Sequence, residues 1–114
     1  MKRFIAALFV LALFVIPAHA LMSFGDIPGA PGMEYDDLKI QGNYVYVTIE
    51  NNNSRPVRFA ASLSFASLRD EILGETFIDI SIIPPGGEAK VKSIILQGDP
   101  AKIKKANKLY WILY

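Results

Sequence analysis

The amino-acid sequence predicts an all-β domain, an antiparallel two-sheet sandwich of six or seven short strands with one short helix before the last strand. Three observations lead to this prediction. Apolar and polar residues alternate with a period of two over most of the chain after residue 36. Turn-forming residues recur at intervals of roughly ten residues. No segment has the length of a helix that could connect two parallel strands.

The first twenty residues are organised like a secretory signal peptide. Lys2 and Arg3 precede an apolar run, and Ala18-His19-Ala20 places small residues where signal peptidase requires them. The apolar run is too short for a permanent membrane anchor. We therefore expect residues 1–20 to be removed, with Leu21 as the first mature residue. The mature protein is expected to be secreted or periplasmic, without a transmembrane segment.

Composition excludes several classes of function. The sequence has no cysteine, and its one histidine, His19, leaves with the signal peptide. Cys-His and Ser-His-Asp catalysis and the usual zinc sites are then excluded. Twelve basic side chains become ten without Lys2 and Arg3, against eleven acidic ones, so the mature net charge is −1. Nucleic-acid binding needs a clear basic excess. We expect a protein that is not an enzyme and needs no cofactor or metal.

Residues 21–35 are predicted to form a flexible arm, because five Gly and Pro residues there interrupt helices and strand ladders. The domain then covers residues 36–114. It begins with a short strand at Leu38 and Ile40. After a turn at residues 41–43, a second strand points Val45, Val47 and Ile49 to one face and Tyr44, Tyr46 and Thr48 to the other.

Residues 57–66 are rich in helix-forming side chains, but their alternation predicts a strand. Its inner face has five apolar residues, namely Val57, Phe59, Ala61, Leu63 and Phe65. A helix would scatter these residues around its circumference. The polar segments 51–54 and 68–74 on either side are predicted loops, and the acidic pairs Asp36-Asp37 and Asp70-Glu71 are predicted turn residues.

The remaining elements complete the sandwich. Ile78, Ile80 and Ile82 line a strand that residues 84–87 end. Over residues 88–97 the alternation of apolar and polar residues is interrupted at Ile94 and Leu96, which indicates a bulge or burial on both faces. Asp99-Pro100 starts a helix that reaches about residue 106, and residues 109–114 form a last strand that is apolar on both faces. We expect one shared core, comprising Val47, Phe59, Leu63, Phe65, Ile80 and Trp111. The architecture is best described as immunoglobulin-like.

The order of elements from about Leu38 to Leu96 resembles small bacterial extracytoplasmic domains of the FxLYD type. The likeness includes the Asn51–Ser54 loop, the turn ending at Gly74 and the segment Ile83-Pro84-Pro85-Gly86-Gly87. Residues 65–68 read Phe-Ala-Ser-Leu and differ from the Phe-x-Leu-Tyr-Asp signature of that family. The resemblance implies an immunoglobulin-like sandwich without an assigned activity.

Tyrosines are the first candidate binding surface. If Trp111 points into the core, Tyr110 and Tyr114 point outward, as Tyr44 and Tyr46 do on another strand. A stripe of tyrosines results if these two strands are neighbours. Such a stripe either stabilises the sheet or recognises a peptide, a glycan or a second copy of the chain.

A group of lysines near the end of the chain is the second candidate, namely Lys102, Lys104, Lys105 and Lys108. These cations either stabilise the negative end of the short helix or contact an anionic surface such as lipid head groups or acidic polysaccharide.

The sequence thus predicts a secreted, non-enzymatic binding or interaction module of the bacterial envelope, with a protein or glycan partner or self-association. Two alternatives stay open. A protease inhibitor on the same scaffold would use the loops Asn51–Arg55 and Pro84–Gly87. A structural subunit of a surface assembly would use the apolar last strand.

Overall fold

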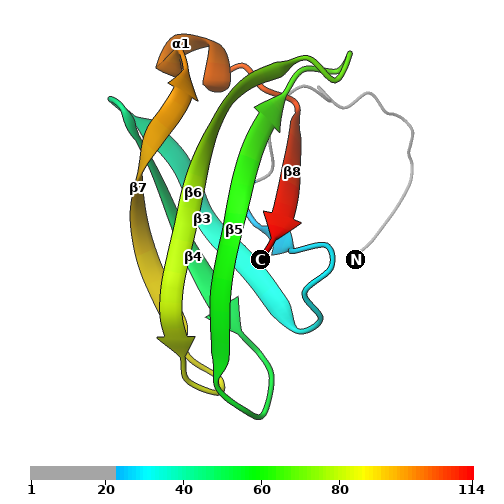
Figure 1. Ribbon diagram of the computed structural model, residues 1–114, viewed down its shortest axis with the longest axis vertical. Helices are drawn as coiled ribbons and strands as arrows, with labels where there is room; N and C mark the ends of the chain where they lie inside the picture. Colours follow the sequence, from blue (N-terminus) through cyan, green and yellow to red (C-terminus); the bar gives the residue numbers. More distant parts are fainter. Residues whose placement is uncertain (1–22) are drawn as a thin grey trace, which may run out of the picture.

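The computed structural model describes residues 23–114 (Figure 1). The predicted signal peptide and its cleavage site lie outside these residues. The described elements follow one another as β2 (Gly25–Asp26), β3 (Met33–Gln41), β4 (Tyr44–Asn51), β5 (Val57–Ala66), β6 (Ile72–Ile83), β7 (Glu88–Gly98), α1 (Pro100–Ile103) and β8 (Lys108–Leu113).

The strands of this part of the chain form one curled, antiparallel sheet of seven strands in the order β2-β3-β4-β7-β6-β5-β8. The prediction of an all-β antiparallel fold, with a short helix before the last strand, is therefore confirmed. The predicted division into two separate sheets is not confirmed, because β7 hydrogen-bonds to β4 and to β6. The half of the sheet formed by β6, β5 and β8 curls over the half formed by β3 and β4 (Figure 1).

The bend between the two halves lies in β7. Leu96 is an extra residue between the pairs Ile95–Thr76 and Gln97–Glu75, so it forms a β-bulge, as the loss of phase predicted. Ile94 and Leu96 both point to solvent, so burial on both faces is not the cause. On the N-terminal side of the bulge in β7, side-chain hydrogen bonds connect β7 and β6 in place of backbone ones. The Thr76 hydroxyl donates to the Ile94 carbonyl at 2.6 Å, and the Ser93 hydroxyl donates to the Phe77 carbonyl at 2.8 Å.

The core lies between the two halves of the sheet. Of the six predicted core residues, Val47, Phe59, Leu63 and Phe65 are buried, and Ile80 and Trp111 pack against them, which confirms the prediction. The Trp111 ring lies 5.6 Å from the Tyr35 ring and 6.1 Å from the Phe59 ring, measured between centroids. This contact packs β8, at one edge of the sheet, against β3 of the opposite half.

The flexible arm predicted over residues 21–35 is wrong for its described part. β2 pairs with β3, with Gly25 opposite Tyr35 and Asp26 opposite Glu34. Ile27 and Met33 are buried at either end of a turn in which the Met33 amide donates to the Ala30 carbonyl at 3.0 Å. The Gly and Pro residues therefore fold the chain back onto the sheet, and the apolar residues at the two ends of the turn anchor it.

Two smaller corrections concern β6 and α1. The ladder with β5 shifts between the pairs Phe59–Ile80 and Val57–Ile83, so Ile82 points to solvent and Ile83 takes the inner position. α1 starts as predicted, with the Asp99 carboxylate accepting from the Ala101 amide at 3.0 Å, but it ends at Ile103.

The side chain of Ile103 fixes α1 on the sheet. It is fully buried, and a Cβ atom at Gly74 would lie only 2.3 Å from the Ile103 Cδ1 atom. Only glycine therefore fits at this position of β6. None of the helices in residues 23–114 is long and apolar enough to cross a membrane.

Candidate ligand-binding face

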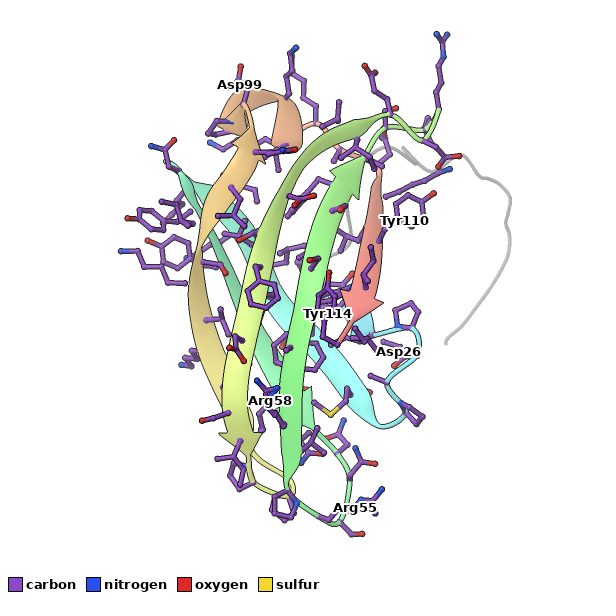
Figure 2. All side chains as sticks on the ribbon, viewed as in Figure 1. Asp26, Arg55, Arg58, Asp99, Tyr110 and Tyr114 are labelled. Atoms are coloured by element: carbon purple, nitrogen blue, oxygen red, sulfur yellow. The ribbon has the colours of Figure 1, made fainter. Side chains whose placement is uncertain are left out.

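The four candidate tyrosines lie on the outer surface but do not form one stripe. Tyr44 and Tyr46 belong to β4, whereas Tyr110 and Tyr114 lie on or directly after β8. β7, β6 and β5 separate these two strands in the sheet order, so the predicted stripe is wrong. Tyr110 and Tyr114 point outward as predicted, with exposed fractions of 42% and 73% (Figure 2).

The outer face of β3, β4 and β7 is built from side chains that lie opposite one another across the three strands. Lys39 and Lys92 lie on either side of Tyr46, and we call this set the basic row. Glu34 and Glu88 lie on either side of Glu50, and we call this set, together with Asp26 on β2, the acidic row. Tyr46 and Glu50 are four residues apart on one strand, so about 14 Å separates the two rows.

In the basic row, two lysines surround the tyrosine rings. The Lys92 Nζ atom lies 4.4 Å from the Tyr44 ring centroid and 5.9 Å from that of Tyr46. The Lys39 Nζ atom lies 5.6 Å from the Tyr46 ring centroid. Neither ammonium group forms a salt bridge with another described residue. Their cation–π contacts hold them in place while leaving their charges available to an anion.

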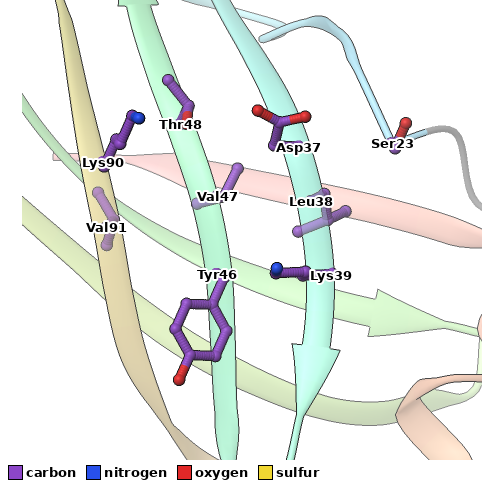
Figure 3. A pocket seen from close by; sticks show the side chains of 9 residues that line it. All are labelled: Ser23, Asp37, Leu38, Lys39, Tyr46, Val47, Thr48, Lys90 and Val91. Atoms are coloured by element: carbon purple, nitrogen blue, oxygen red, sulfur yellow. The ribbon is translucent and has the colours of Figure 1, made fainter.

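Beside the basic row, a bulge in β3 opens a hollow of about 580 Å³. The register jumps between Asp36 and Lys39, and Asp37 takes a positive φ of 54° there, stabilised by its amide donating to the Asp36 carboxylate at 2.8 Å. Lys39 and Tyr46 lie at one end of the hollow, and Asp37, Thr48 and Lys90 lie at the other (Figure 3). The hollow thus combines an aromatic ring, two ammonium groups, a hydroxyl group and a carboxylate.

The acidic row aligns four carboxylates in register across four strands. Partial burial raises the pKa of Glu50, and the charges of Asp36, Glu34, Glu88 and Asp37 raise it further. Like charges directly opposite each other destabilise a sheet. No three acidic side chains among residues 23–114 converge closely enough to hold a metal ion.

Replacing Glu50 with glutamine is expected to raise the thermal midpoint at pH 7 and low salt. Because the folded-state pKa of Glu50 is raised, its protonated form stabilises the fold at low pH, and this contribution is lost as the pH rises through that pKa. The gain from Glu50→Gln should therefore shrink at acidic pH and at high salt. Glu71→Gln, a matched charge removal in an exposed turn, is the control. Equal gains from both variants would mean that only net charge matters.

One lysine of the predicted group, Lys108, is paired with an acidic side chain. The Lys108 ammonium donates to the Asp70 carboxylate at 2.8 Å, and the Tyr110 hydroxyl donates to the same carboxylate oxygen. These two hydrogen bonds lower the pKa of Asp70. Asp70 lies in the turn predicted for it, and Lys108 is already engaged there. Lys102, Lys104 and Lys105 stay exposed at the end of α1.

The loops proposed for a protease inhibitor do lie together, and one side chain joins them. The Asn51 side-chain amide donates to the carbonyls of Arg55, Ile83 and Pro84 at 2.9, 3.0 and 3.3 Å. Its oxygen accepts from the Asn53 amide at 2.9 Å. Asn51 is fully buried, so it fixes both loops at the end of the molecule where Figure 2 labels Arg55.

The chain matches no protein-family model, no curated protein and no solved structure. The likeness to FxLYD-type domains therefore stays a prediction. The outer face, above all Lys39, Lys90 and Lys92, offers the chemistry that bears on function. Sequence reasoning did not select these lysines as site residues, because their common position depends on the pairing of β4 with both β3 and β7. The sequence did contain one signal for this site, because Lys90 and Lys92 are two residues apart and so lie on the same face of a strand.

Proposed function

We propose that this protein is a secreted, non-enzymatic binding module of the bacterial envelope, and that the outer face of β3, β4 and β7 binds an acidic saccharide. The observation that carries this proposal is the Tyr46 ring between two lysines that form no salt bridge with another described residue, at one end of the hollow. The signal peptide predicted in residues 1–20 supports export. The two facing halves of the sheet around one core support an immunoglobulin-like scaffold as the finer description of the fold.

The groups of the hollow match the groups of a sugar that carries a carboxylate. The ammonium groups of Lys39 and Lys92, on either side of Tyr46, attract the carboxylate through charge-assisted hydrogen bonds, and Lys90 adds a third positive charge at the other end of the hollow. The Tyr46 ring offers an apolar surface to the C–H face of the sugar ring. The Asp37 carboxylate and the Thr48 hydroxyl accept hydrogen bonds from sugar hydroxyls.

The acidic row decides between a saccharide and a membrane. A flat anionic membrane would face the basic and acidic rows together, because only about 14 Å separates them on one strand. The carboxylates of Asp26, Glu34, Glu50 and Glu88 would then repel its head groups. A compact acidic sugar lies on the basic row and in the hollow without reaching them. The geometry therefore favours the saccharide among the anionic ligands.

The test is titration calorimetry with an oligosaccharide of uronic acid residues, with its carboxyl-reduced neutral form as the ligand control. The double variant K39Q/K92Q is expected to lose about tenfold or more in affinity, because it removes two charge-assisted contacts. The variant K102Q/K104Q, which removes two lysines near α1, should bind like the parent. Equal binding of the neutral sugar, or unchanged binding by K39Q/K92Q, would contradict the proposal. Binding to anionic vesicles alone would replace the saccharide by a membrane.

A protease inhibitor is the second candidate, because Asn51 holds the loops Asn51–Arg55 and Pro84–Gly87 side by side. Inhibition of a purified protease by the wild-type chain, lost in Arg55→Ala and retained in K39Q/K92Q, would favour this candidate over saccharide binding.

A further inference from the structure

The last strand of the sheet has an open backbone edge. β8 pairs with β5 through six consecutive residue pairs without a register shift, and no described strand pairs with its other side. The Tyr114 amide donates to the Ala60 carbonyl at 2.9 Å, so the even-numbered residues exchange hydrogen bonds with β5. The amide and carbonyl groups of Leu109, Trp111 and Leu113 therefore point to the open side.

The two edges of the sheet differ in how they are protected. β2 has only two residues, one of which is the charged Asp26. β8 has six residues, with no proline and no bulge. Its one charged residue, Lys108, is held by Asp70. Natural edge strands are usually short, charged, bulged or covered, because a regular open edge recruits another strand. Along Leu109 to Leu113, β8 has no charged side chain, proline or bulge, and no other described strand covers its edge.

An apolar surface continues from this edge across the outer face of β5. Tyr110, Ile112 and Tyr114 alternate on the outer side with exposed fractions of 42%, 54% and 73%. Ser62 pairs with both Ile112 and Phe77, and the Tyr114 hydroxyl hydrogen-bonds to the Ser62 hydroxyl at 3.0 Å. The Phe77 and Tyr114 rings lie 5.9 Å apart between centroids. The open edge is thus bordered by exposed aromatic and aliphatic side chains.

We infer that a second copy of this chain adds to the edge, so that two β8 strands pair antiparallel and join two sheets into one. A two-fold axis perpendicular to the sheet at Trp111 pairs Trp111 with its own copy and Leu109 with Leu113 of the second copy. These are the residues whose backbone amide and carbonyl groups point away from β5. In this register the open groups of one β8 strand therefore lie opposite the open groups of the other. On the outer face, Tyr110 then lies beside Ile112 of the second copy, an aromatic and β-branched pair that stabilises sheets.

The charges of β8 also favour its own copy as the partner. In this register Lys108 lies opposite Tyr114 of the second copy, so no two lysines face each other across the junction. A single pair of edge strands buries less area than a standard interface, and we expect a dissociation constant on the order of 10 µM. Because each copy has one such edge, the assembly closes at the dimer.

The dimer does not depend on saccharide binding, although the two would reinforce each other. The axis is perpendicular to the β5–β8 face, so the β3–β4–β7 faces of both copies lie on the opposite side of the joined sheet. If the proposed function holds, one long acidic polysaccharide then contacts two sites and gains avidity.

Sedimentation velocity of the chain from residue 21 onward tests the inference. The parent is expected to shift from monomer to dimer between about 1 and 200 µM. Ile112→Lys should stay monomeric over this range, because it places a charge in the junction. Ile94→Lys is the matched control, since Ile94 is exposed to 53%, against 54% for Ile112, but lies on β7. It should dimerise like the parent.

A charge swap tests the register itself. Tyr110→Glu alone should also stay monomeric, whereas an equimolar mixture of the I112K and Y110E chains should restore a dimer, because the two positions are neighbours across the junction. Circular dichroism checks that each variant is folded. A monomeric parent, equal loss in Ile94→Lys, no dimer in the mixture or growth beyond the dimer would each overturn the inference. None of these readouts involves the saccharide.

Discussion

Truncation of Phe65 to alanine is expected to lower the free energy of unfolding by about 3 to 5 kcal/mol, the usual cost of removing a fully buried aromatic ring. Phe65 has no exposed surface, and its strand lies between β6 and β8 in the sheet. Neighbouring side chains cannot close the cavity without moving the backbone of paired strands. A domain of this size has a free energy of unfolding of about 5 to 15 kcal/mol, so this one substitution removes a substantial part of it.

Phe77→Ala is the matched control for this experiment. Phe77 lies on the neighbouring strand β6 and is exposed to 43%, so the same truncation leaves no closed cavity. We expect a loss of less than about 1 kcal/mol from it. Chemical denaturation of both variants, at a protein concentration below that of dimer formation, gives the comparison. Equal losses would mean that Phe65 and Phe77 do not lie on opposite faces of the sheet.

The alternation along each strand was predictable from the sequence, because it depends only on residues two apart. The inner face of β5 from Phe59 to Phe65 follows directly from it, and so does the outward position of Tyr110. Asp99-Pro100 marked the start of α1 for an equally local reason, the capping of the first turn. Predictions of this kind require no knowledge of which strands are neighbours.

The sheet order could not be predicted in the same way. Tyr46 and Tyr110 have the same outward signal in the sequence, but three strands, β7, β6 and β5, lie between their strands β4 and β8 in the sheet. The site follows from that order, since Lys39 and Lys92 meet at Tyr46 only through pairings with β3 and β7. The prediction of a flexible arm over residues 21–35 failed for a related reason. Gly and Pro show where a ladder is interrupted, whereas the burial of Ile27 decides whether the chain returns to the sheet.

Replacing Asn51 with aspartate is expected to cost about 3 kcal/mol or more, although the two side chains have the same shape. The Asn51 amide donates to the carbonyls of Arg55, Ile83 and Pro84 in a fully buried position. A carboxylate cannot donate there, and its charge would face these carbonyl oxygens without solvent. Burial raises the folded-state pKa of the introduced carboxyl, so the loss should grow as the pH rises through that pKa and should be smallest in acid.

Asn53→Asp supplies the control, because Asn53 lies in the same loop and its side-chain amide donates to the exposed Pro31 carbonyl at 3.1 Å. Water can replace this partner, so a loss of less than about 1 kcal/mol is expected. Thermal unfolding of both variants between pH 4 and pH 8 separates a buried charge from a change in loop sequence. A pH-independent loss in Asn51→Asp would show that the side chain acts by shape alone. A loss of stability that grows as the introduced carboxyl ionises would establish that one amide group holds the loops Asn51–Arg55 and Pro84–Gly87 together. Any partner that binds at that end of the molecule requires this arrangement of the loops.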